Sequence, residues 1–300
     1  MAVVAAFLID LLCGEPPARW HPVVWIGRAL SSVGAPWPQA TTGAQFARGA
    51  AVWLALALVC VAVGIAADRS ITAIAALAPP VLGIVVRGLL LGSLLKPLLA
   101  WRMLRDEVCA VEHALGRGVE AGRDRLRHIV GRDTAELSMT VVRESALESL
   151  AENLNDSFVA PLFWFCLGGL PGAALYRFAN TADAMYGLRG RWEWAGKWAA
   201  RADDVLSCVP ARLTALLLAI AAWRWPGGLP REARRTASPN GGWPMGMLAL
   251  ALDVRLSRPG YYVLHAAGHC AGPNDISRGL RIAGRAAWSA VLVAALVQLA

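Results

Sequence analysis

Long uncharged runs recur along the chain and predict membrane-spanning helices. Residues 49–67 carry no charge, and a helix needs roughly 20 residues to cross about 30 Å of hydrocarbon. After a polar turn expected at residues 68–69, apolar residues continue over 71–95, where Pro79–Pro80 predicts a broken or tilted second helix. An arginine at the membrane centre costs about 2.5–3.5 kcal/mol, so Arg87 should find a polar partner or reach the surface.

Three further apolar runs predict the remaining crossings. Residues 157–176 contain Gly168–Gly169 and Pro171 in their middle, which weaken a continuous helix. Two half-helices that enter and return, or one crossing helix, are both compatible with this run. The fourth and fifth candidates are residues 205–223 and 286–300.

The segment between the second and third runs is polar. In residues 101–156, arginines and carboxylates predominate and apolar residues recur at helical spacing, which predicts an amphipathic helical pair outside the hydrocarbon. The expected fold class is all-α: a polytopic helical integral membrane protein with amphipathic helices. We expect one domain, residues 1–300, with a polar site on the cytoplasmic face.

Composition supports a membrane protein. Hydrophobic residues make up 57% and charged residues 17% of the chain, against roughly 25% charged residues in soluble domains. The net charge of +8 indicates loops held against an anionic membrane face, which places the protein in the cell (inner) membrane with its basic loops in the cytoplasm. The lipid bilayer is thus an expected partner. Nucleic acid is not, because no basic stripe is interleaved with aromatic residues.

The densest polar cluster lies just before the third apolar run. Glu144, Glu148 and Glu152 are four residues apart, which places three carboxylates on one face of a helix, and Asp156 follows one turn later. Like charges at this spacing repel one another. The sequence leaves two readings open: a solvated acidic face, or a site for a divalent cation or cationic substrate.

Two other polar clusters flank apolar runs. Asn180, Thr181 and Asp183 follow the third run, where they could form a helix cap or a site. Asp203 and Asp204 precede the fourth run; because neighbours on a helix point in different directions, at most one of them faces a site. Oxygen ligands of this kind suit Mg²⁺, which is often held by one or two carboxylates together with substrate phosphates.

The familiar phosphate and zinc motifs are missing. Residues 190–197 do not fit a P-loop, and no GxGxxG occurs. His265 and His269 have the spacing of zinc ligands but lack the glutamate of HExxH. Asn240, in the turn-forming run SPNGGWP, could present backbone N–H groups to an anion, whereas an exposed loop is the plainer reading. The six cysteines lie far apart and predict no disulfide framework.

The order of the motifs resembles a known family. GEPP, HPV and IGR near the start are followed by ESALESLAENLNDSFVAPLFW, YRFANTADAM, ARADDVLSCVPARLT, SPNGGWP and GPNDISRGLRI. Together, over residues 8–285, they are similar to the adenosylcobinamide-phosphate synthase family of cobalamin biosynthesis, the CbiB/CobD membrane proteins. Leu150, Ala182 and Ala184 depart from the family's usual residues, and residues 187–196, which could touch substrate, depart more.

The resemblance implies an enzyme that uses ATP and Mg²⁺. It would join adenosylcobyric acid to (R)-1-aminopropan-2-ol or its O-phosphate through an amide bond. The catalytic residues implied are Glu148, Glu152, Asp156 and Asp183, with Glu148 as the candidate base for the incoming ammonium. The metal ligands implied are Glu152, Asp156, Asp183, Asp203 and Asp204. The substrate-binding residues implied are His21, Arg143, Asn153, Arg177, Asn180, Thr181, Arg201 and Asn240; among these, the three arginines would neutralise phosphate charge.

Two rival functions remain at the level of sequence. A transporter or channel for a corrinoid or small anionic solute fits the broken helices and the charges within apolar runs. A scaffold that gathers other corrinoid-pathway enzymes fits as well, but leaves the stacked carboxylates unexplained. The sequence also leaves open the form of the amine substrate and the oligomeric state.

Overall fold

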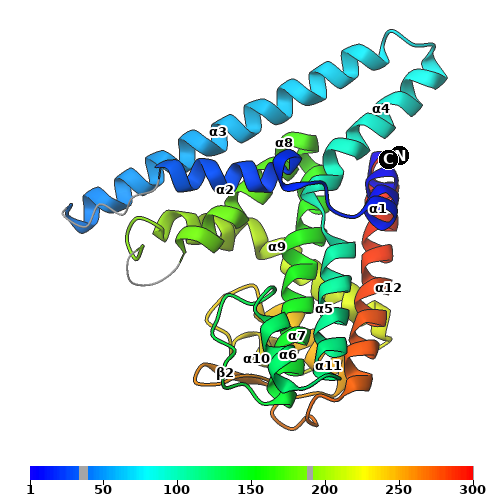
Figure 1. Cartoon of the computed structure of the whole chain (residues 1–300). Helices are drawn as coiled ribbons and strands as arrows, with labels where there is room; N and C mark the ends of the chain where they lie inside the picture. The colour runs from blue at the N-terminus through cyan, green and yellow to red at the C-terminus, as the bar shows by residue number, and fades with distance from the viewer. Residues whose placement is uncertain (34–39, 188–191, 300) are drawn as a thin grey trace. The chain divides into compact units, whose positions relative to one another are not determined.

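The computed structural model describes residues 1–33, 40–187 and 192–299. The chain forms two compact units, which are described separately below. The first unit comprises Met1–Ala100, Ala160–Ser207 and Val293–Ala300, and the second comprises Trp101–Val159 and Cys208–Leu292. Figure 1 labels the α-helices of both units and strand β2 along the chain.

Apart from one short hairpin, the regular structure of the described residues is helical. Elements of the first unit are α1 (Ala2–Cys13), the 3-10 helix η1 (Ala18–Trp20), α2 (Pro22–Val33), α3 (Thr42–Ala75), α4 (Pro80–Leu95), the 3-10 helix η2 (Lys96–Leu98), α8 (Ala160–Tyr186) and the start of α9 (Lys197–Ala222). Elements of the second unit are α5 (Trp101–Leu115), α6 (Val119–Leu126), α7 (Met139–Leu154), the π-helical turn η3 (Asn155–Val159), the rest of α9, α10 (Leu229–Ala233), α11 (Gly242–Leu252), β1 (Leu256–Arg258), β2 (Tyr262–Leu264) and most of α12 (Pro273–Val297).

The hairpin of α3 and α4 differs from the sequence prediction in its turn (Figure 1). Helix α3 continues through residues 68–69 to Ala75, so the turn expected there is wrong; the chain turns instead over residues 76–79. Proline at the start of α4 explains the position, because it cannot continue a helix but fits a first helical turn. Arg87 of α4 has its expected polar partner, since its Nη2 lies 3.9 Å from Asp68 Oδ1 of α3.

Glycines bring α4 close to α1. Gly88 and Gly92 are four residues apart and therefore share one helix face. A Cβ atom on Gly92 would lie 2.7 Å from the Cβ of Ala5 and 2.8 Å from the carbonyl oxygen of Ala2. A Cβ atom on Gly88 would lie 2.9 Å from the Cβ of Met1. The small face of α4 thus permits backbone-to-backbone packing that larger residues would prevent.

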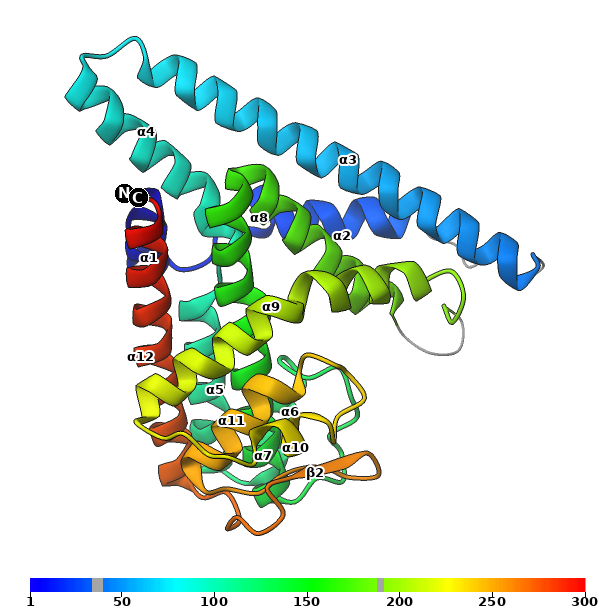
Figure 2. The same cartoon turned by 180° about the vertical axis from the view of Figure 1, so that it is seen from behind.

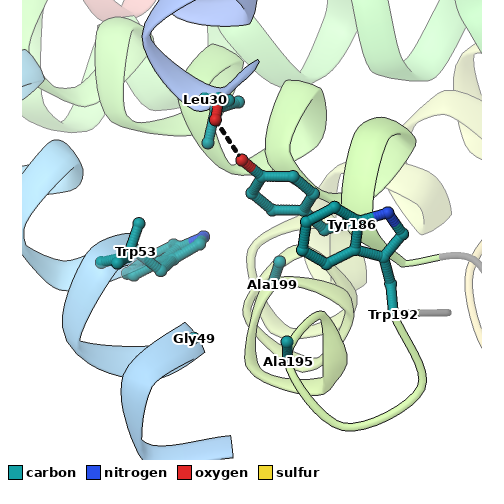
Figure 3. A pocket seen from close by; sticks show the side chains of 8 residues that line it. Leu30, Gly49, Trp53, Tyr186, Trp192, Ala195 and Ala199 are labelled. Carbon is teal, nitrogen blue, oxygen red and sulfur yellow. Dashed lines mark hydrogen bonds between the residues drawn. The ribbon is translucent and has the colours of Figure 1, made fainter. Parts of the chain in front are cut away.

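The aromatic core of the first unit joins α2, α3, α8 and α9. Trp53 packs against Phe178 with ring centroids 5.4 Å apart, and Tyr186 against Trp192 at 4.4 Å. Figure 3 shows the hydroxyl of Tyr186 donating a hydrogen bond to the carbonyl of Leu30. The adjoining cavity holds only about 10 Å³, room for no more than about one water molecule, so it is a packing gap and not a ligand site.

Helix α8 is broken near its middle. Gly168 has φ −134° and ψ 16°, and Gly169 has φ 60° and ψ −152°, a conformation that is essentially confined to glycine. Pro171 follows immediately and cannot donate a backbone hydrogen bond. Figure 2 shows α8 changing direction at this break. The interruption lies where the sequence predicts weakness; whether the two halves enter and leave the membrane on the same side stays a prediction.

In the second unit, α7 is the central helix. It packs against α5, α6, α11 and β1, and Leu147, Leu150 and Leu154 are fully buried. The amphipathic pair expected over residues 101–156 is in fact three helices, because a turn at residues 116–118 separates α6 from α5. Strands β1 and β2 pair antiparallel, with Leu256 opposite Leu264 and Arg258 opposite Tyr262. The predicted elements do not include this hairpin.

Among the residues that the structure describes, five helical stretches are long and apolar enough to cross a membrane. They are Thr42–Ala76, Pro80–Leu115, Met139–Tyr186, Lys197–Ala222 and Pro273–Val297. Each predicted apolar run overlaps one of them, although the run 71–95 is divided between the end of α3 and α4, and the run 286–300 is only the last part of a longer helix. The predicted class, an all-α polytopic membrane protein, is confirmed.

Candidate functional site

The three glutamates of α7 have different surroundings. Glu144 is fully buried and accepts hydrogen bonds from the backbone N–H of Ser257 (3.0 Å) and from its hydroxyl, so it fastens β1 to the helix. Glu148 is 4% exposed, and with Glu152 it lines a cavity. Because Glu144 and Glu148 are buried, the alternative of a fully solvated acidic face is wrong.

We call this the α7 cavity. It has a volume of about 220 Å³ and lies between α7, the loop that follows α6, and the β1–β2 hairpin. Its lining residues are Ile129, Val130, Gly131, Arg132, Ser145, Glu148, Ser149, Glu152, Arg258 and Tyr262. Four of these lining residues are charged, whereas ligand pockets are usually lined mostly by apolar side chains. A lining of this kind is suited to a small charged ligand.

Local hydrogen bonds hold the loop that carries Arg132. Arg123 Nε donates to the carbonyl of Leu137 (2.7 Å), and the hydroxyl of Thr134 donates to the carbonyl of Arg123 (3.0 Å). The hydroxyl of Ser149 donates to the carbonyl of Ile129 (3.0 Å) and so joins the loop to α7. These hydrogen bonds therefore fix the loop on both sides of Arg132, and the loop positions this side chain at the cavity.

Arg132 forms the central ion pair of the cavity. Its Nη2 donates to Glu148 Oε2 (2.9 Å) and to Ser145 Oγ (2.6 Å). Within the described residues, Arg132 Nε, Glu148 Oε1 and Arg258 Nε are buried polar atoms without a hydrogen-bond partner. Leaving a buried donor or acceptor unsatisfied costs about 1–3 kcal/mol. Such atoms therefore favour a polar ligand that completes their hydrogen bonds.

Tyr262 adds a neutral hydroxyl to this charged cavity. Burial raises its pKa above the usual value, and the negative charges of Glu148 and Glu152 raise it further. The phenol therefore keeps its proton near neutral pH, and its hydroxyl donates to Met245 Sδ (3.8 Å).

The turn that contains Asn240 lies beside Glu152. A Cβ atom on Gly241 would stand 3.3 Å from Glu152 Oε1. Within the turn, the backbone N–H groups of Asn240 and Gly241 both donate to Ser238 Oγ, at 3.2 and 3.1 Å. The side chain of Asn240 accepts a hydrogen bond from Arg212 (2.8 Å). Both N–H groups are therefore already hydrogen-bonded within the turn. The turn does not form the open anion nest that the sequence allows.

Polar residues continue from α7 into the π-helical turn. Asn153 Nδ2 donates to the carbonyl and hydroxyl oxygens of Ser149, at 3.0 and 3.1 Å. Asn155 Nδ2 donates to Asp156 Oδ1 (2.7 Å), and Asn155 Oδ1 accepts from Thr214 (3.0 Å). Single π-helical turns are frequent at functional sites, which fits this position next to the α7 cavity.

Arg143 faces away from the cavity residues. Its Nε and Nη2 each donate to one carboxylate oxygen of Glu112 on α5, both at 2.8 Å. This bidentate pair fastens α7 to α5. The predicted phosphate-binding role of Arg143 would require that pair to open.

The other predicted site residues belong to the first unit. On α8 these are Arg177, Asn180, Thr181 and Asp183, and on α9 they are Arg201, Asp203 and Asp204. The hydroxyl of Thr181 donates to the carbonyl of Arg177 (2.6 Å), which is a local helix contact. The side chain of Arg201 is 75% exposed and lies 3.9 Å from Asp204. Residues 188–191, in the stretch that departs from the family pattern, lie outside the described residues.

His21 belongs to a buried charged cluster of the first unit. Its Nε2 lies 3.0 Å from Glu15 Oε2, and Lys96 Nζ donates to Glu15 Oε1 (2.8 Å). Lys96 Nζ also lies 3.2 Å from Asp10 Oδ1, and both of these side chains are almost fully buried. Burial would raise the pKa of Glu15, but the hydrogen bonds from His21 and Lys96 outweigh it and lower that pKa. This cluster connects α1, its following loop and η2.

The described residues do not form a ready-made metal centre. Among them, no group of three or more histidine, cysteine, aspartate or glutamate side chains is arranged to hold an ion. The predicted Mg²⁺ ligands are divided, with Glu152 and Asp156 in the second unit and Asp183, Asp203 and Asp204 in the first. His265 and His269, considered as zinc ligands, instead pair with Asp253 (2.7 Å) and Asp275 (3.0 Å). All six cysteines are free, as predicted.

The fold and the α7 cavity together define an all-α polytopic membrane protein with a small cavity that is lined by charged residues. The family model described as CobD/Cbib protein matches residues 3–283. This chain therefore belongs to the CobD/CbiB family of cobalamin biosynthesis, as the motif order predicts.

Curated relatives agree with this assignment. A cobalamin biosynthesis protein CobD from Rhodobacter capsulatus is 38% identical over 313 residues, covering 98% of this chain and 96% of its own. A probable cobalamin biosynthesis protein CobD from Methanothermobacter thermautotrophicus is 38% identical over 270 residues, covering 87% and 85%. The CobD protein of Brucella suis is 39% identical over 274 residues, covering 86% and 81%. No solved structure matches this chain.

Sequence reasoning missed several residues that line the α7 cavity. Arg132 lies in a charged loop with many arginines. Arg258 and Tyr262 flank the three-residue loop of a hairpin, and Pro259–Gly260 in that loop is a turn signal that the sequence does offer. Ser145 and Ser149 lie on α7 between the glutamates, where helical spacing alone could have placed them on neighbouring faces. Only the glutamates gave a strong signal, because stacked like charges need an explanation.

Proposed function

We propose that the protein is an ATP-dependent ligase that joins adenosylcobyric acid, through its propionate carboxylate, to (R)-1-aminopropan-2-ol or its O-phosphate. The product would be adenosylcobinamide or its phosphate. One observation carries the proposal: the α7 cavity gathers two arginines and two glutamates in a chain whose relatives are named cobalamin biosynthesis proteins.

The chemistry requires activation of the carboxylate. An oxygen of the propionate attacks the γ-phosphorus of ATP, the bond to the bridging oxygen breaks, and ADP leaves. The resulting acyl phosphate is attacked at its carbonyl carbon by the amine, and inorganic phosphate leaves. The amine arrives as an ammonium, so one proton must be removed before its lone pair can attack.

Glu148 is the candidate for this proton transfer. It is buried, it lines the cavity, and its Oε1 has no hydrogen-bond partner among the described residues. Arg132 and Arg258 replace the arginines chosen from sequence as the charges best placed to bind an anion there. Glu152 and Asn153 lie on the same helix, and Asp156 follows one turn later.

We retain ATP and Mg²⁺ as proposed cofactors. Mg²⁺ is commonly bound through one or two carboxylates and several phosphate oxygens, so it can arrive with the nucleotide without a protein site of three ligands. The proposed location is the cell (inner) membrane with the site on the cytoplasmic side, where ATP is present. Support comes from the five apolar helices and from the concentration of arginines in the loops.

The test is product formation by the purified, detergent-solubilised full chain. It receives adenosylcobyric acid, Mg-ATP and either amine, and both ADP and the corrinoid amide are followed. We expect ADP and amide in equal amounts. Glu152→Gln keeps the shape of the side chain but removes its charge, and should lower turnover at least tenfold, whereas Glu136→Gln in an exposed loop should not.

The same experiment separates the rival functions. Folded protein that binds the corrinoid but forms neither ADP nor amide would favour a transporter or a scaffold for other pathway enzymes. Unchanged turnover in Glu152→Gln would remove Glu152 from the proposed site while leaving the ligase assignment intact.

A further inference from the structure

The second unit contains another depression, between α9, α11 and the segment that joins α9 to α10. We call it the α9–α11 groove. It is open to the surface and has a volume of about 250 Å³. Its lining includes Leu216 and Ala219 of α9, Trp225 and Leu229 of the joining segment and α10, and Met247 of α11. This lining is mostly apolar, so the groove suits a hydrocarbon chain and not a small charged ligand.

Arg212 closes one end of the groove as part of its wall. Its Nη1 donates to the carbonyl of Cys208 (2.7 Å) and to Asn240 Oδ1 (2.8 Å). The guanidinium carbon lies 4.8 Å from the centroid of the Trp243 ring, which is a cation–π contact. These contacts hold Arg212 within the protein, so an anionic group at the groove has to be bound by other arginines.

The segment that follows α9 supplies such arginines. Residues 223–235 read WRWPGGLPREARR and come directly after a helix that is long and apolar enough to cross a membrane. Arg235 pairs with the buried Glu232 at 3.1 Å. The other arginines of the segment are exposed; they are Arg224, Arg231 and Arg234. A cluster of exposed arginines beside a membrane span attracts anionic lipid headgroups.

Two exposed tryptophans place this segment at a membrane–water interface. Trp223 is 84% and Trp225 66% exposed. Tryptophan is enriched at both interfaces of a membrane, because its ring is apolar and its N–H is polar. Trp225 also lines the groove and is next to Arg224 in the chain. An apolar groove and a group of exposed cations therefore adjoin at the end of α9.

We propose that the α9–α11 groove binds an anionic phospholipid, with part of an acyl chain along Leu216 and Met247 and the phosphate on Arg224 and Arg231. The volume of about 250 Å³ holds only part of a chain, and the open side leaves the rest of the lipid in the bilayer. Free phosphate lacks the chain, and a zwitterionic lipid lacks the net negative charge. Both should therefore bind more weakly than the anionic lipid.

This lipid site is separate from the proposed ligation. The groove belongs to the same compact unit as the α7 cavity, and α11 packs against α7. A lipid bound in the groove would hold the unit that carries the candidate site against the membrane surface.

Competition between two lipids tests the proposal. The full-length protein in detergent is mixed with equal amounts of dioleoyl-phosphatidylglycerol and dioleoyl-phosphatidylcholine, which have the same acyl chains, and bound lipid is counted by native mass spectrometry. Phosphatidylglycerol should be retained at least tenfold more than phosphatidylcholine. Raising the salt concentration should reduce this preference, because salt screens exposed charges. Equal retention of the two lipids would overturn the proposal.

Paired arginine variants test where the headgroup binds. Arg224→Gln combined with Arg231→Gln should lower the preference for phosphatidylglycerol at least fivefold. Arg117→Gln combined with Arg127→Gln removes the same charge from exposed positions of the same unit and should leave the preference unchanged. An equal loss in both double variants would show that net charge governs lipid binding, which would overturn the assignment to this site. Neither pair lines the α7 cavity, so ligase turnover in detergent should stay the same.

Filling the groove tests where the acyl chain binds. Leu216 is 45% exposed, so Leu216→Trp places a larger side chain in the groove without entering the core. Retention of phosphatidylglycerol should fall at least fivefold. Val205→Trp is the control, because Val205 is a 74% exposed residue of the same helix outside the groove lining. Undiminished retention in a Leu216→Trp variant with an unchanged unfolding temperature, or detergent retained in the groove in place of the lipid, would overturn the proposal.

Discussion

At the residue scale, the glutamates of α7 separate a structural role from a chemical one. Glu144 is fully buried and binds the backbone of Ser257 in β1, with Arg255 Nη2 3.4 Å away. We expect Glu144→Gln to reduce the free energy of unfolding by about 1–3 kcal/mol, because the amide cannot replace two charge-assisted acceptor sites. Thermal unfolding in detergent measures this loss, and KM for the amine should change little.

Glu148→Gln, one helical turn away, is the matched variant. It should lower turnover strongly, and its unfolding temperature should fall as well, because the substitution removes the charge that pairs with Arg132 at 2.9 Å. A pattern in which Glu144→Gln abolishes turnover in fully folded protein, with stability unchanged, would reverse the two roles.

The pKa of Glu15 allows a prediction of how acid affects the attachment of the N-terminal segment. Its pKa in the folded protein is lowered from 4.5, so the unfolded state binds a proton more readily than the folded one. The stabilisation by Glu15 is therefore complete above about pH 4.5 and is lost as pH falls through the lower folded value. Protease cleavage after α1 should be slow and constant from about pH 8 to pH 5 and should accelerate in stronger acid.

Glu15→Gln should weaken this protection at neutral pH and flatten its acid dependence. Glu120→Gln is the control, because Glu120 is 77% exposed and its ion pair with Arg123 lies on the surface. An identical pH profile in Glu15→Gln and in the original protein would show that other carboxylates control attachment of the segment.

Part of the site can be predicted from the sequence, because the spacing of residues along one helix is a local signal. Stacked glutamates on one helix face are visible from spacing, and Glu148 and Glu152 do line the cavity. Arg132 and Arg258 reach the same cavity from a loop and a hairpin that are distant in sequence. Their roles depend on tertiary packing, which no periodicity within either segment encodes.

At the element scale, backbone chemistry decided where helices end. The turn expected at Asp68 and Arg69 does not form, because charged residues alone do not stop a helix whose backbone hydrogen bonds remain available. Pro79–Pro80 and the glycine conformation at Gly169 do interrupt helices, and both were visible in the sequence. Helix breakers are therefore a better guide to boundaries here than charge.

The contact between α1 and α4 gives a sharp test of helix packing. Gly92→Ala would place a methyl group 2.7 Å from Ala5 Cβ and 2.8 Å from the carbonyl oxygen of Ala2. The helices must then separate, so we expect a loss of about 1–3 kcal/mol in stability, as for other overpacked contacts. Thermal unfolding and faster proteolysis of the N-terminal segment would report it.

Gly43→Ala is the matched control. Gly43 also lies in a helix, but no other atom lies within 4 Å of an added Cβ. Alanine should be neutral or stabilising there by up to about 1 kcal/mol, because it favours the helix more than glycine does. Equal effects of the two substitutions would indicate that helix propensity, and not packing, controls stability.

At the scale of the whole molecule, the predicted site residues fall into both compact units. Glu148, Glu152 and Asp156 belong to the second unit, whereas Asp183 and Asp203 belong to the first. The sequence grouped them because each cluster borders an apolar run. The chain's membrane topology decides whether that grouping is possible, since ligands of one ion must lie on the same side of the membrane.

The break in α8 makes this topology testable. If the two halves of the apolar run enter and return, the loop before α7 and the segment after α8 lie on the same, cytoplasmic side. Single cysteines at Glu136 and Glu193, both exposed, are introduced into a chain whose six native cysteines are replaced. An impermeant maleimide should label both only from the cytoplasmic side, and a cysteine at Leu77, in the exposed turn between α3 and α4, only from the other side. Labelling of Glu193→Cys from the side opposite to Glu136→Cys would instead show that α8 crosses the membrane, and Asp183 could then not share a cytoplasmic metal site with Glu152.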